Sequence, residues 1–350
     1  TGIGRRCAGR AMTTEPPPGS GRRLARRLAR RRLLGTLALA AGGTAALRAA
    51  AAAAAPWPPP RLRFIVAYAV GGLSSEVAHA LGDALSRRLA VPVLVEHRPG
   101  AGGTLALEAL ARAPADGSVI AFCAITPLTL APLLGRVPYD AERDIVPVTA
   151  VMRTPVLIAG TPALPVDGMA AMLDWARRRP GGLRWASTGV GTTGHLVLER
   201  VARAAGIEVT AVPYGGGGRP LTDALGGQFE VLSTNVAPTP MRHVRAGRLK
   251  ALAVTGPGRL PGLPQVPTLG ELGLAEANVV STFGVFAPHH LPERRKAQLH
   301  AALLAALRAS QVPALLKAAD NLVLGAGPEA FAQLIADDRA MHRRWLADRR

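Results

Sequence analysis

Residues 93–107 read V-L-V-E-H-R-P-G-A-G-G-T-L-A-L, and this stretch decides the fold. Its apolar start predicts a short strand, and Gly100, Gly102 and Gly103 allow the following turn to adopt positive φ. Thr104 has the side chain of a helix N-cap, with a helix expected over 105–112. A strand that passes through glycines into a helix leaves backbone N–H groups without partners, which is how anion sites are built. Taken alone, the stretch also fits an ordinary tight connection.

The same strand–glycine–helix pattern occurs three more times in the chain. A strand at 61–68 leads through Gly71, Gly72 and Ser74 into a helix that ends near residue 88. Strands at 183–187 and 209–214 lead through the glycine turns 189–194 and 215–218 into helices that end at 205 and 225. In a parallel sheet such turns lie at the carboxyl ends of the strands, where open α/β sheets bind ligands.

Alternation of strands and helices predicts an α/β fold with mostly parallel sheets flanked by helices. The glycine turns form two clusters along the 350 residues, which favours two small lobes over a single sheet. We expect the chain to cross between lobes near residue 153 and to return near 256–280. Lobe 1 would then contain residues 56–153 and 276–350, lobe 2 would contain residues 154–275, and the glycine turns would face a cleft between them.

Residues 1–55 are predicted to be an export signal. R-R-R-L-L at 30–34 precedes an apolar run at 35–47 and an alanine tract at 49–55, the order typical of a signal peptide. The string resembles a twin-arginine signal, and Met12 is a possible true start that would make residues 1–11 an upstream over-read. An uncleaved anchor is the alternative. The segment has eleven arginines against one acid, Glu15, so it supplies ten of the nineteen net positive charges, and we expect no nucleic-acid partner.

Catalytic and cofactor motifs are incomplete in this sequence. Residues 189–194 match the spacing G-x-G-x-x-G, but the acid expected about twenty residues later, at the end of the next strand, is missing. No P-loop and no G-x-S-x-G motif occurs. His195, His289 and His290 lack the spacing of a zinc site. We therefore expect binding without catalysis, no cofactor and no metal, with an NAD-dependent enzyme using Gly189–Gly194 as the alternative.

The mature chain resembles the Bug family of periplasmic solute-binding receptors, which are associated with tripartite tricarboxylate transporters. The resemblance rests on an ordered series of motifs between residues 62 and 345. They are G-G (71–72), E-H-R-P-G-A-G-G (96–103), D-G (116–117), P-Y-D (138–140), A-S-T-G-V-G-T (186–192), V-P-Y (212–214), L-T-D-A-L-G-G-Q (221–228) and A-G-R-L-K-A-L-A-V-T (246–255).

The resemblance implies a two-lobed periplasmic binding protein of type II that closes over a small carboxylate without a cofactor. It implies a periplasmic location with the signal removed, a monomer, and a transporter permease as the membrane partner. A receptor that presents its closed lobes to a sensor kinase is a further alternative. The implied ligand-binding residues are Tyr68, Gly71, Gly72, Ser74, Ala101, Gly102, Gly103, Thr104, Thr126, Ser187, Gly191, Thr192, Thr193, His195, Tyr214, Thr234 and Asn235.

Departures from the family pattern bear on the solute. Ser75 and Thr234 stand where the family often has aspartates, and His97 and Thr104 stand where asparagine is common. Losing the two acids removes partners for an amino or hydroxyl group on the ligand. The sequence therefore predicts a carboxylate that is unsubstituted or bears apolar substituents.

Overall fold

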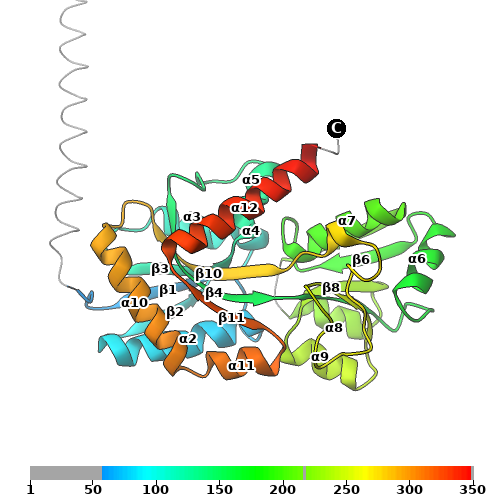
Figure 1. The fold of residues 1–350 in the computed structure, drawn as a ribbon, viewed down its shortest axis with the longest axis horizontal. Coiled ribbons are helices and arrows are strands. Elements are labelled where there is room, and N and C mark those ends of the chain that lie inside the picture. Colours follow the sequence, from blue (N-terminus) through cyan, green and yellow to red (C-terminus); the bar gives the residue numbers. More distant parts are fainter. Residues whose placement is uncertain (1–56, 216–217, 348–350) are drawn as a thin grey trace, which may run out of the picture. The chain divides into compact units, whose positions relative to one another are not determined.

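The computed structural model describes residues 57–215 and 218–347, all within one compact unit that spans residues 52–350. The predicted export signal lies outside the described residues. In the described residues the strands form two sheets (Figure 1). Among these residues no single helix is both long and apolar enough to cross a membrane, and one bent pair passes by length and composition only.

The first sheet, sheet A, has the strand order β11-β4-β10-β3-β1-β2. Its strands are β1 (Leu62–Val66), β2 (Val93–His97), β3 (Val119–Ala124), β4 (Ile145–Thr154), β10 (Ser281–Pro288) and β11 (Leu322–Ala326). Strand β1 is buried on both faces: Phe64 and Val66 enter one core cluster, while Ile65 and Ala67 enter the other. This alternation is the two-residue period of a strand covered on both sides.

The second sheet, sheet B, has the strand order β7-β6-β8-β5-β9. Its strands are β5 (Val156–Gly160), β6 (Leu183–Ser187), β7 (Val209–Pro213), β8 (Val231–Asn235) and β9 (Lys250–Val254). Only Pro155 separates β4 of sheet A from β5 of sheet B, and the chain returns to sheet A in β10. The two-lobed fold is therefore confirmed, while the residue-level lobe boundaries stay a prediction.

The expectation of mostly parallel sheets is corrected, because both sheets are mixed. Strand β1 pairs in parallel with β2 and β3, and β6 pairs in parallel with β7 and β8. The strands that carry the chain between the sheets, β4, β5 and β10, pair antiparallel with their neighbours. The physical reason is that β5 and β10 each enter their sheet directly from the other sheet and therefore run opposite to its parallel strands. Strand β4 keeps the direction of β3 and is antiparallel only to its neighbours β10 and β11.

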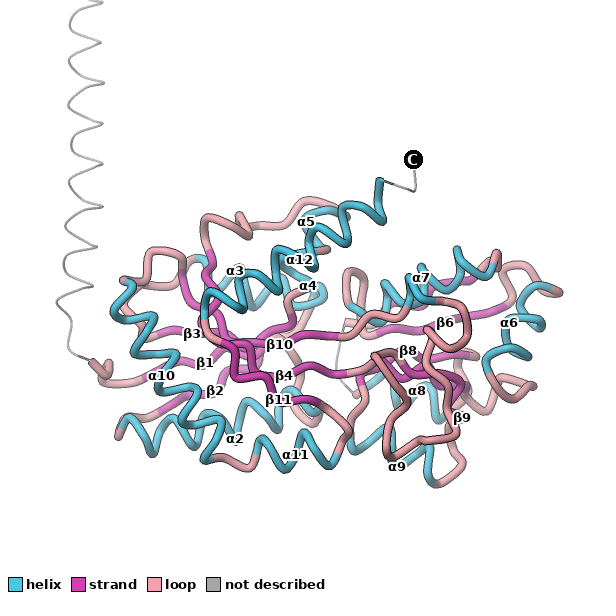
Figure 2. The backbone as a smooth tube through the Cα atoms, in the orientation of Figure 1, coloured by secondary structure: helices cyan, strands magenta, loops and turns pink. Residues whose placement is uncertain are grey.

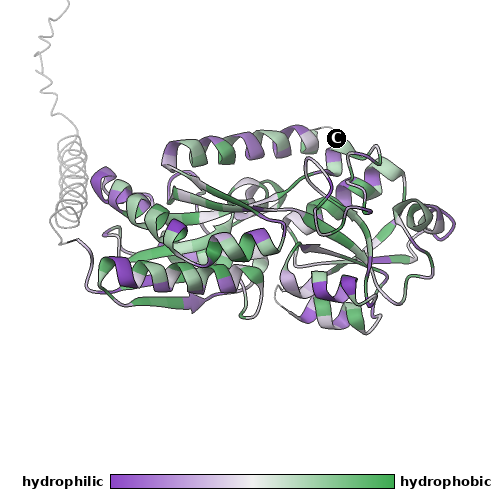
Figure 3. Ribbon diagram, turned by 60° about the horizontal axis from the view of Figure 1, so that its bottom comes forward, coloured by the Kyte–Doolittle hydropathy of each residue, from purple (hydrophilic) through white to green (hydrophobic). Residues whose placement is uncertain are grey.

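Helices cover both faces of each sheet (Figure 2). Sheet A packs against α2 (Leu73–Leu89), α10 (Glu293–Ala309) and α11 (Val312–Ala318) on one face, and against α3 (Thr104–Ala111) and α12 (Pro328–Ala347) on the other. Sheet B packs against α6 (Met169–Arg177) and α7 (Thr193–Ala205) on one face, and against α8 (Arg219–Leu225) and α9 (Pro238–Arg245) on the other. Apolar residues concentrate in the strands, and hydrophilic residues alternate along the helices (Figure 3).

All four predicted strand–glycine–helix units are present. The N-cap expected at Thr104 is wrong: Gly103 is the cap, and Thr104 begins α3 with its hydroxyl donating to the Ala101 carbonyl at 3.0 Å. Strand β11 and the short helices α4 (Thr126–Thr129) and α5 (Ala131–Leu134) were not expected from the pattern. Strand β11 has two exposed apolar residues, Leu322 and Val323, and no clean alternation, because it lies at the edge of sheet A.

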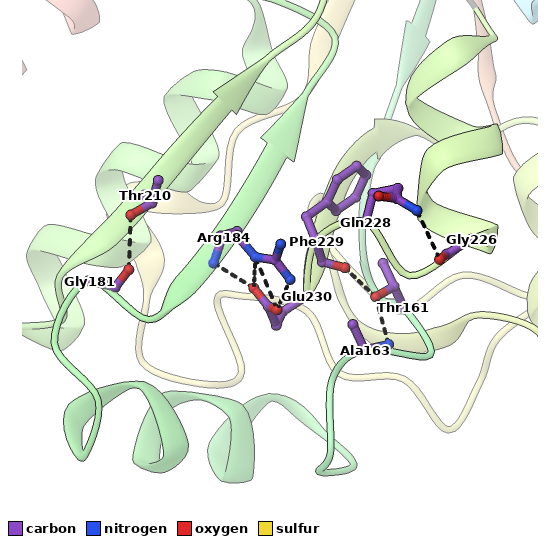
Figure 4. A network of polar contacts seen from close by, with 9 residues as sticks. All are labelled: Thr161, Ala163, Gly181, Arg184, Thr210, Gly226, Gln228, Phe229 and Glu230. Carbon is purple, nitrogen blue, oxygen red and sulfur yellow. Dashed lines mark hydrogen bonds and ion pairs between the residues drawn. The ribbon is translucent and has the colours of Figure 1, made fainter.

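A polar network joins β6 to the start of β8 in sheet B (Figure 4). The buried carboxylate of Glu230 accepts hydrogen bonds from the backbone N–H of Arg184 at 2.8 Å and from its guanidinium. The hydrogen bond to Glu230 raises the pKa of Arg184, so its guanidinium stays charged. The Thr161 hydroxyl donates to the Phe229 carbonyl beside it. The network lies at the amino ends of the parallel strands β6 and β8.

Candidate functional site

A cavity of about 380 Å³ lies where the carboxyl ends of the parallel strands of both sheets come together. From sheet A it is lined by the segments that follow β1 and β2 and by the end of β4. From sheet B it is lined by the segments that follow β6, β7 and β8. This is the position at which open α/β sheets bind ligands. A larger hollow of about 620 Å³ lies beside the edge strand β9, but no glycine turn reaches it.

The predicted site residues divide into two groups by position. Those that line the cavity are Tyr68, Gly71, Gly72, Ser74, Gly102, Gly103, Thr192, Thr234 and Asn235. Those that are not part of its lining are Ala101, Thr104, Thr126, Ser187, Gly191, Thr193, His195 and Tyr214. Most of the second group are buried next to the lining segments, where their side chains hold those segments in place.

Two glycine turns from different sheets touch each other at the cavity. A Cβ at Gly102 would lie 2.8 Å from the Val190 carbonyl oxygen, and Gly102 has a φ of +64°. A Cβ at Gly189 would lie 2.9 Å from the Tyr214 carbonyl oxygen, and Gly189 has a φ of +145°. At these two positions only glycine combines the backbone conformation with such a close approach. The turn after β2 and the turn after β6 therefore close one side of the cavity together.

Helix N-termini supply the hydrogen-bond donors of the cavity wall. Helix α2 begins at Leu73, and its N-cap, Gly72, offers no side-chain acceptor. The N–H groups of Leu73 and Ser74 lie in the first turn, so the helix itself provides no acceptor for them. Thr192 caps α7 by accepting from the His195 N–H at 3.3 Å. Unpaired N–H groups in the first turn of a helix and the helix dipole both favour an anion without a cationic side chain.

Several of the predicted residues make hydrogen bonds that stabilise the cavity wall. The Tyr214 hydroxyl donates to Asp223 Oδ2 at 2.7 Å; burial and this bond raise the pKa of Tyr214 to about 12. The Ser187 hydroxyl lies 3.4 Å from the Gly189 carbonyl oxygen. Tyr68 lines the cavity, its hydroxyl oxygen accepts from the Ala124 N–H at 2.9 Å, and burial raises its pKa well above the usual range. These phenols are neutral at physiological pH and can only donate or accept hydrogen bonds.

Sequence reasoning missed the remaining residues of the cavity lining. They include the apolar residues Met152, Leu221, Leu225, Ala237, Pro238 and Pro240, and the polar residues Glu76, Thr154, Thr188, Thr222, Thr239 and His243. The Thr154 hydroxyl is buried and has no hydrogen-bond partner among the described residues. Met152 and Thr154 lie in β4, Thr188 follows β6, and most of the others lie in the helices α2, α8 and α9. Their side chains line the cavity only through tertiary packing.

The described lining of the cavity contains few charged side chains. No Lys or Arg is part of its lining, and its only acidic residue, Glu76, is exposed. Within the described ranges, no group of three or more His, Cys, Asp or Glu residues could hold a metal ion. The lining combines hydroxyls and main-chain groups with apolar carbon, which suits recognition of an amphiphilic anion.

Comparisons with known proteins agree with this geometry. Residues 77–349 match the model of the tripartite tricarboxylate transporter family receptor. Protein BugT of Bordetella pertussis is 30% identical over 284 residues, covering 81% of this chain and 87% of the relative.

Solved structures share the fold. The periplasmic binding protein BugD is 26% identical with a TM-score of 0.78, and the match covers 83% of this chain and 98% of BugD. MatC from Rhodopseudomonas palustris, solved with bound malate, is 27% identical with a TM-score of 0.76, and the match covers 82% of this chain and 98% of MatC. A further R. palustris protein, solved with adipate, is 28% identical with a TM-score of 0.75 over 83% of this chain and 97% of that protein.

Proposed function

This chain belongs to the tripartite tricarboxylate transporter receptor family, and from this premise we propose that it captures a small carboxylate-bearing solute in the periplasm. The receptor would be exported, lose its signal, act as a monomer without cofactor or enzymatic activity, and deliver the solute to a tripartite tricarboxylate-type permease. The relatives solved with malate and adipate support a carboxylate as the ligand class.

One observation carries the proposal: the first turn of α2, whose N-cap Gly72 has no side-chain acceptor, belongs to a cavity lined from both sheets whose described lining contains no Lys or Arg. Amides at a helix N-terminus hold a carboxylate by hydrogen bonds of roughly 1.5–3 kcal/mol each. Because the cavity is lined from both lobes, a bound anion would contact both of them.

The apolar part of the cavity lining favours an apolar body on the solute. Leu221, Leu225 and Pro240 belong to this lining, and their side chains offer no partner for a second anionic group. Glu76 is exposed, so water screens its charge. We propose that a monocarboxylate with an apolar chain or ring binds more tightly than the corresponding α-amino acid or hydroxy acid.

A thermal-shift screen of organic acids tests the function. A ligand at a hundredfold excess over its Kd stabilises the native state by about 2.7 kcal/mol, which corresponds to a rise of about 4 °C in Tm. We expect monocarboxylates with apolar bodies to give the largest shifts. If no carboxylate shifts Tm while NAD binds at micromolar concentration, the receptor proposal is wrong and the enzyme alternative is favoured.

The charge state of His243 predicts a pH dependence of binding. Desolvation and the neighbouring Arg248 and Arg242 lower the pKa of His243, so this cavity-lining imidazole is neutral at pH 7. At lower pH the His243 imidazole takes up a proton and adds a positive charge to the cavity wall. We therefore expect carboxylate affinity to rise several-fold between pH 7 and pH 5. Calorimetry over this range should show a flat profile in His243→Gln. An equal rise in that variant would contradict the assignment.

A further inference from the structure

Two histidines outside the cavity lining form a close pair. His79 is on the exposed side of α2, and His97 ends β2. Their Nε2 atoms lie 3.2 Å apart, and their ring centroids lie 5.4 Å apart. Helix α2 and strand β2 therefore bring two imidazole Nε2 atoms close together.

The other ring nitrogen of His97, Nδ1, already has a hydrogen-bond partner. His97 Nδ1 lies 2.7 Å from the carbonyl oxygen of Tyr68. A carbonyl can only accept, so the proton of the neutral ring is on Nδ1 and the lone pair is on Nε2. The Ser75 hydroxyl oxygen lies 3.5 Å from this same Nε2 atom. A backbone carbonyl that fixes the tautomer in this way is the usual outer partner of a metal-binding histidine.

We propose that His79 and His97 form a binding site for a divalent transition-metal ion such as Zn²⁺, Ni²⁺ or Cu²⁺. Two nitrogens 3.2 Å apart, each about 2.05 Å from a shared zinc ion, subtend about 100° at the metal, close to the tetrahedral value of about 109°. The ion replaces the proton that otherwise joins the two nitrogens. Because His79 is exposed, a small rotation of its side chain brings both lone pairs onto the ion.

The site is open on its solvent side. No third His, Cys, Asp or Glu joins the pair within residues 57–215 and 218–347. Water fills the remaining positions, with the Ser75 hydroxyl as the nearest protein oxygen. Neutral imidazoles select Zn²⁺, Ni²⁺ and Cu²⁺ over Mg²⁺ and Ca²⁺, which prefer oxygen ligands.

The metal site goes beyond the proposed receptor function and does not depend on it. The ion joins α2 to the end of β2, and through the Nδ1–carbonyl bond it also fixes Tyr68, whose segment lines the solute cavity. Metal binding therefore stiffens the start of that segment in the native state. The unfolded chain has no such pair, because residues 79 and 97 are far apart along it.

Calorimetry and thermal unfolding with ZnCl₂ test the site, using the full mature chain without a histidine tag. We expect one saturable Zn²⁺ per chain and a rise in Tm of about 4 °C at a hundredfold excess over Kd, reversed by EDTA. His79→Gln should weaken Zn²⁺ binding at least about tenfold and leave the metal-free Tm unchanged, since His79 is exposed. His97→Gln should weaken binding equally.

The matched control is the other close histidine pair, His289 and His290, whose ring centroids lie 5.3 Å apart. The double variant His289→Gln/His290→Gln should keep wild-type affinity for Zn²⁺. Absence of saturable binding in the wild type, retention of affinity in His79→Gln, or loss of affinity in the control would each overturn the assignment. Solute affinity is not part of these measurements, so failure of the metal site leaves the receptor function standing.

Discussion

Replacing Gly72 by leucine is expected to lower solute affinity at least about a hundredfold while keeping the fold. Gly72 is part of the cavity wall, and a Cβ built there meets no atom within 4 Å. Its φ of −105° and ψ of 167° are accessible to any residue, so the substitution introduces no backbone strain. The added side chain therefore occupies space that the solute needs, beside the N–H groups of the first turn of α2.

Calorimetry with the best acid from the thermal-shift screen measures this loss. Gly72→Ser is the graded variant: serine is small and is a good N-cap, so most of the affinity should remain. Gly258→Leu is the matched control, because Gly258 also has no atom within 4 Å of a built Cβ and is not in the cavity lining. Wild-type affinity in Gly72→Leu would show that the solute does not occupy this cavity.

Replacing Gly284 by alanine is expected to destabilise the protein by about 3 kcal/mol, the upper range for overpacking a core. Gly284 lies in the central strand β10, and its added Cβ would lie 2.3 Å from two ring atoms of Phe331 and 2.7 Å from the Thr149 carbonyl oxygen. Phe331 is fully buried on α12, with its ring 5.2 Å from that of Phe286. Neither the backbone oxygen nor the packed ring can move away cheaply.

Urea unfolding of the two proteins measures the difference in the free energy of unfolding. The double variant Gly284→Ala/Phe331→Leu should be more stable than the sum of the two single changes predicts, because the smaller leucine makes room for the methyl group. Gly258→Ala should be neutral. A cost below about 1 kcal/mol for Gly284→Ala would mean that α12 packs differently against β10.

The local pattern of the sequence was sufficient for most elements. A strand, a glycine turn and a helix follow one another within 17 to 28 residues, so backbone preference and hydrophobic period specify them without distant contacts. The unit at residues 183–205 illustrates this, with β6 at Leu183–Ser187 and α7 at Thr193–Ala205. Strand β11 escaped detection because its apolar residues are exposed at a sheet edge, where burial leaves no period in the sequence.

The candidate site was only partly predictable. Gly102 and Thr192 could be found because their turns need glycine or a capping hydroxyl. Leu225 and His243 could not, since an ordinary helix residue becomes part of a cavity only when another lobe faces it. His195 and Tyr214 looked like ligand contacts in the sequence, but they lie outside the cavity lining, and the Tyr214 hydroxyl is bound to Asp223.

The sequence by itself determined the local chemistry of this protein: turns that expose N–H groups after apolar strands, and the family to which their order belongs. Only the tertiary structure decided that sheets A and B are mixed, that Gly102 meets the carbonyl of Val190, and that His79 meets His97. The physical reason is the distance along the chain over which each interaction acts. Backbone preference acts over a few neighbouring residues, whereas a cavity or a metal-binding pair arises from residues that long-range packing brings together.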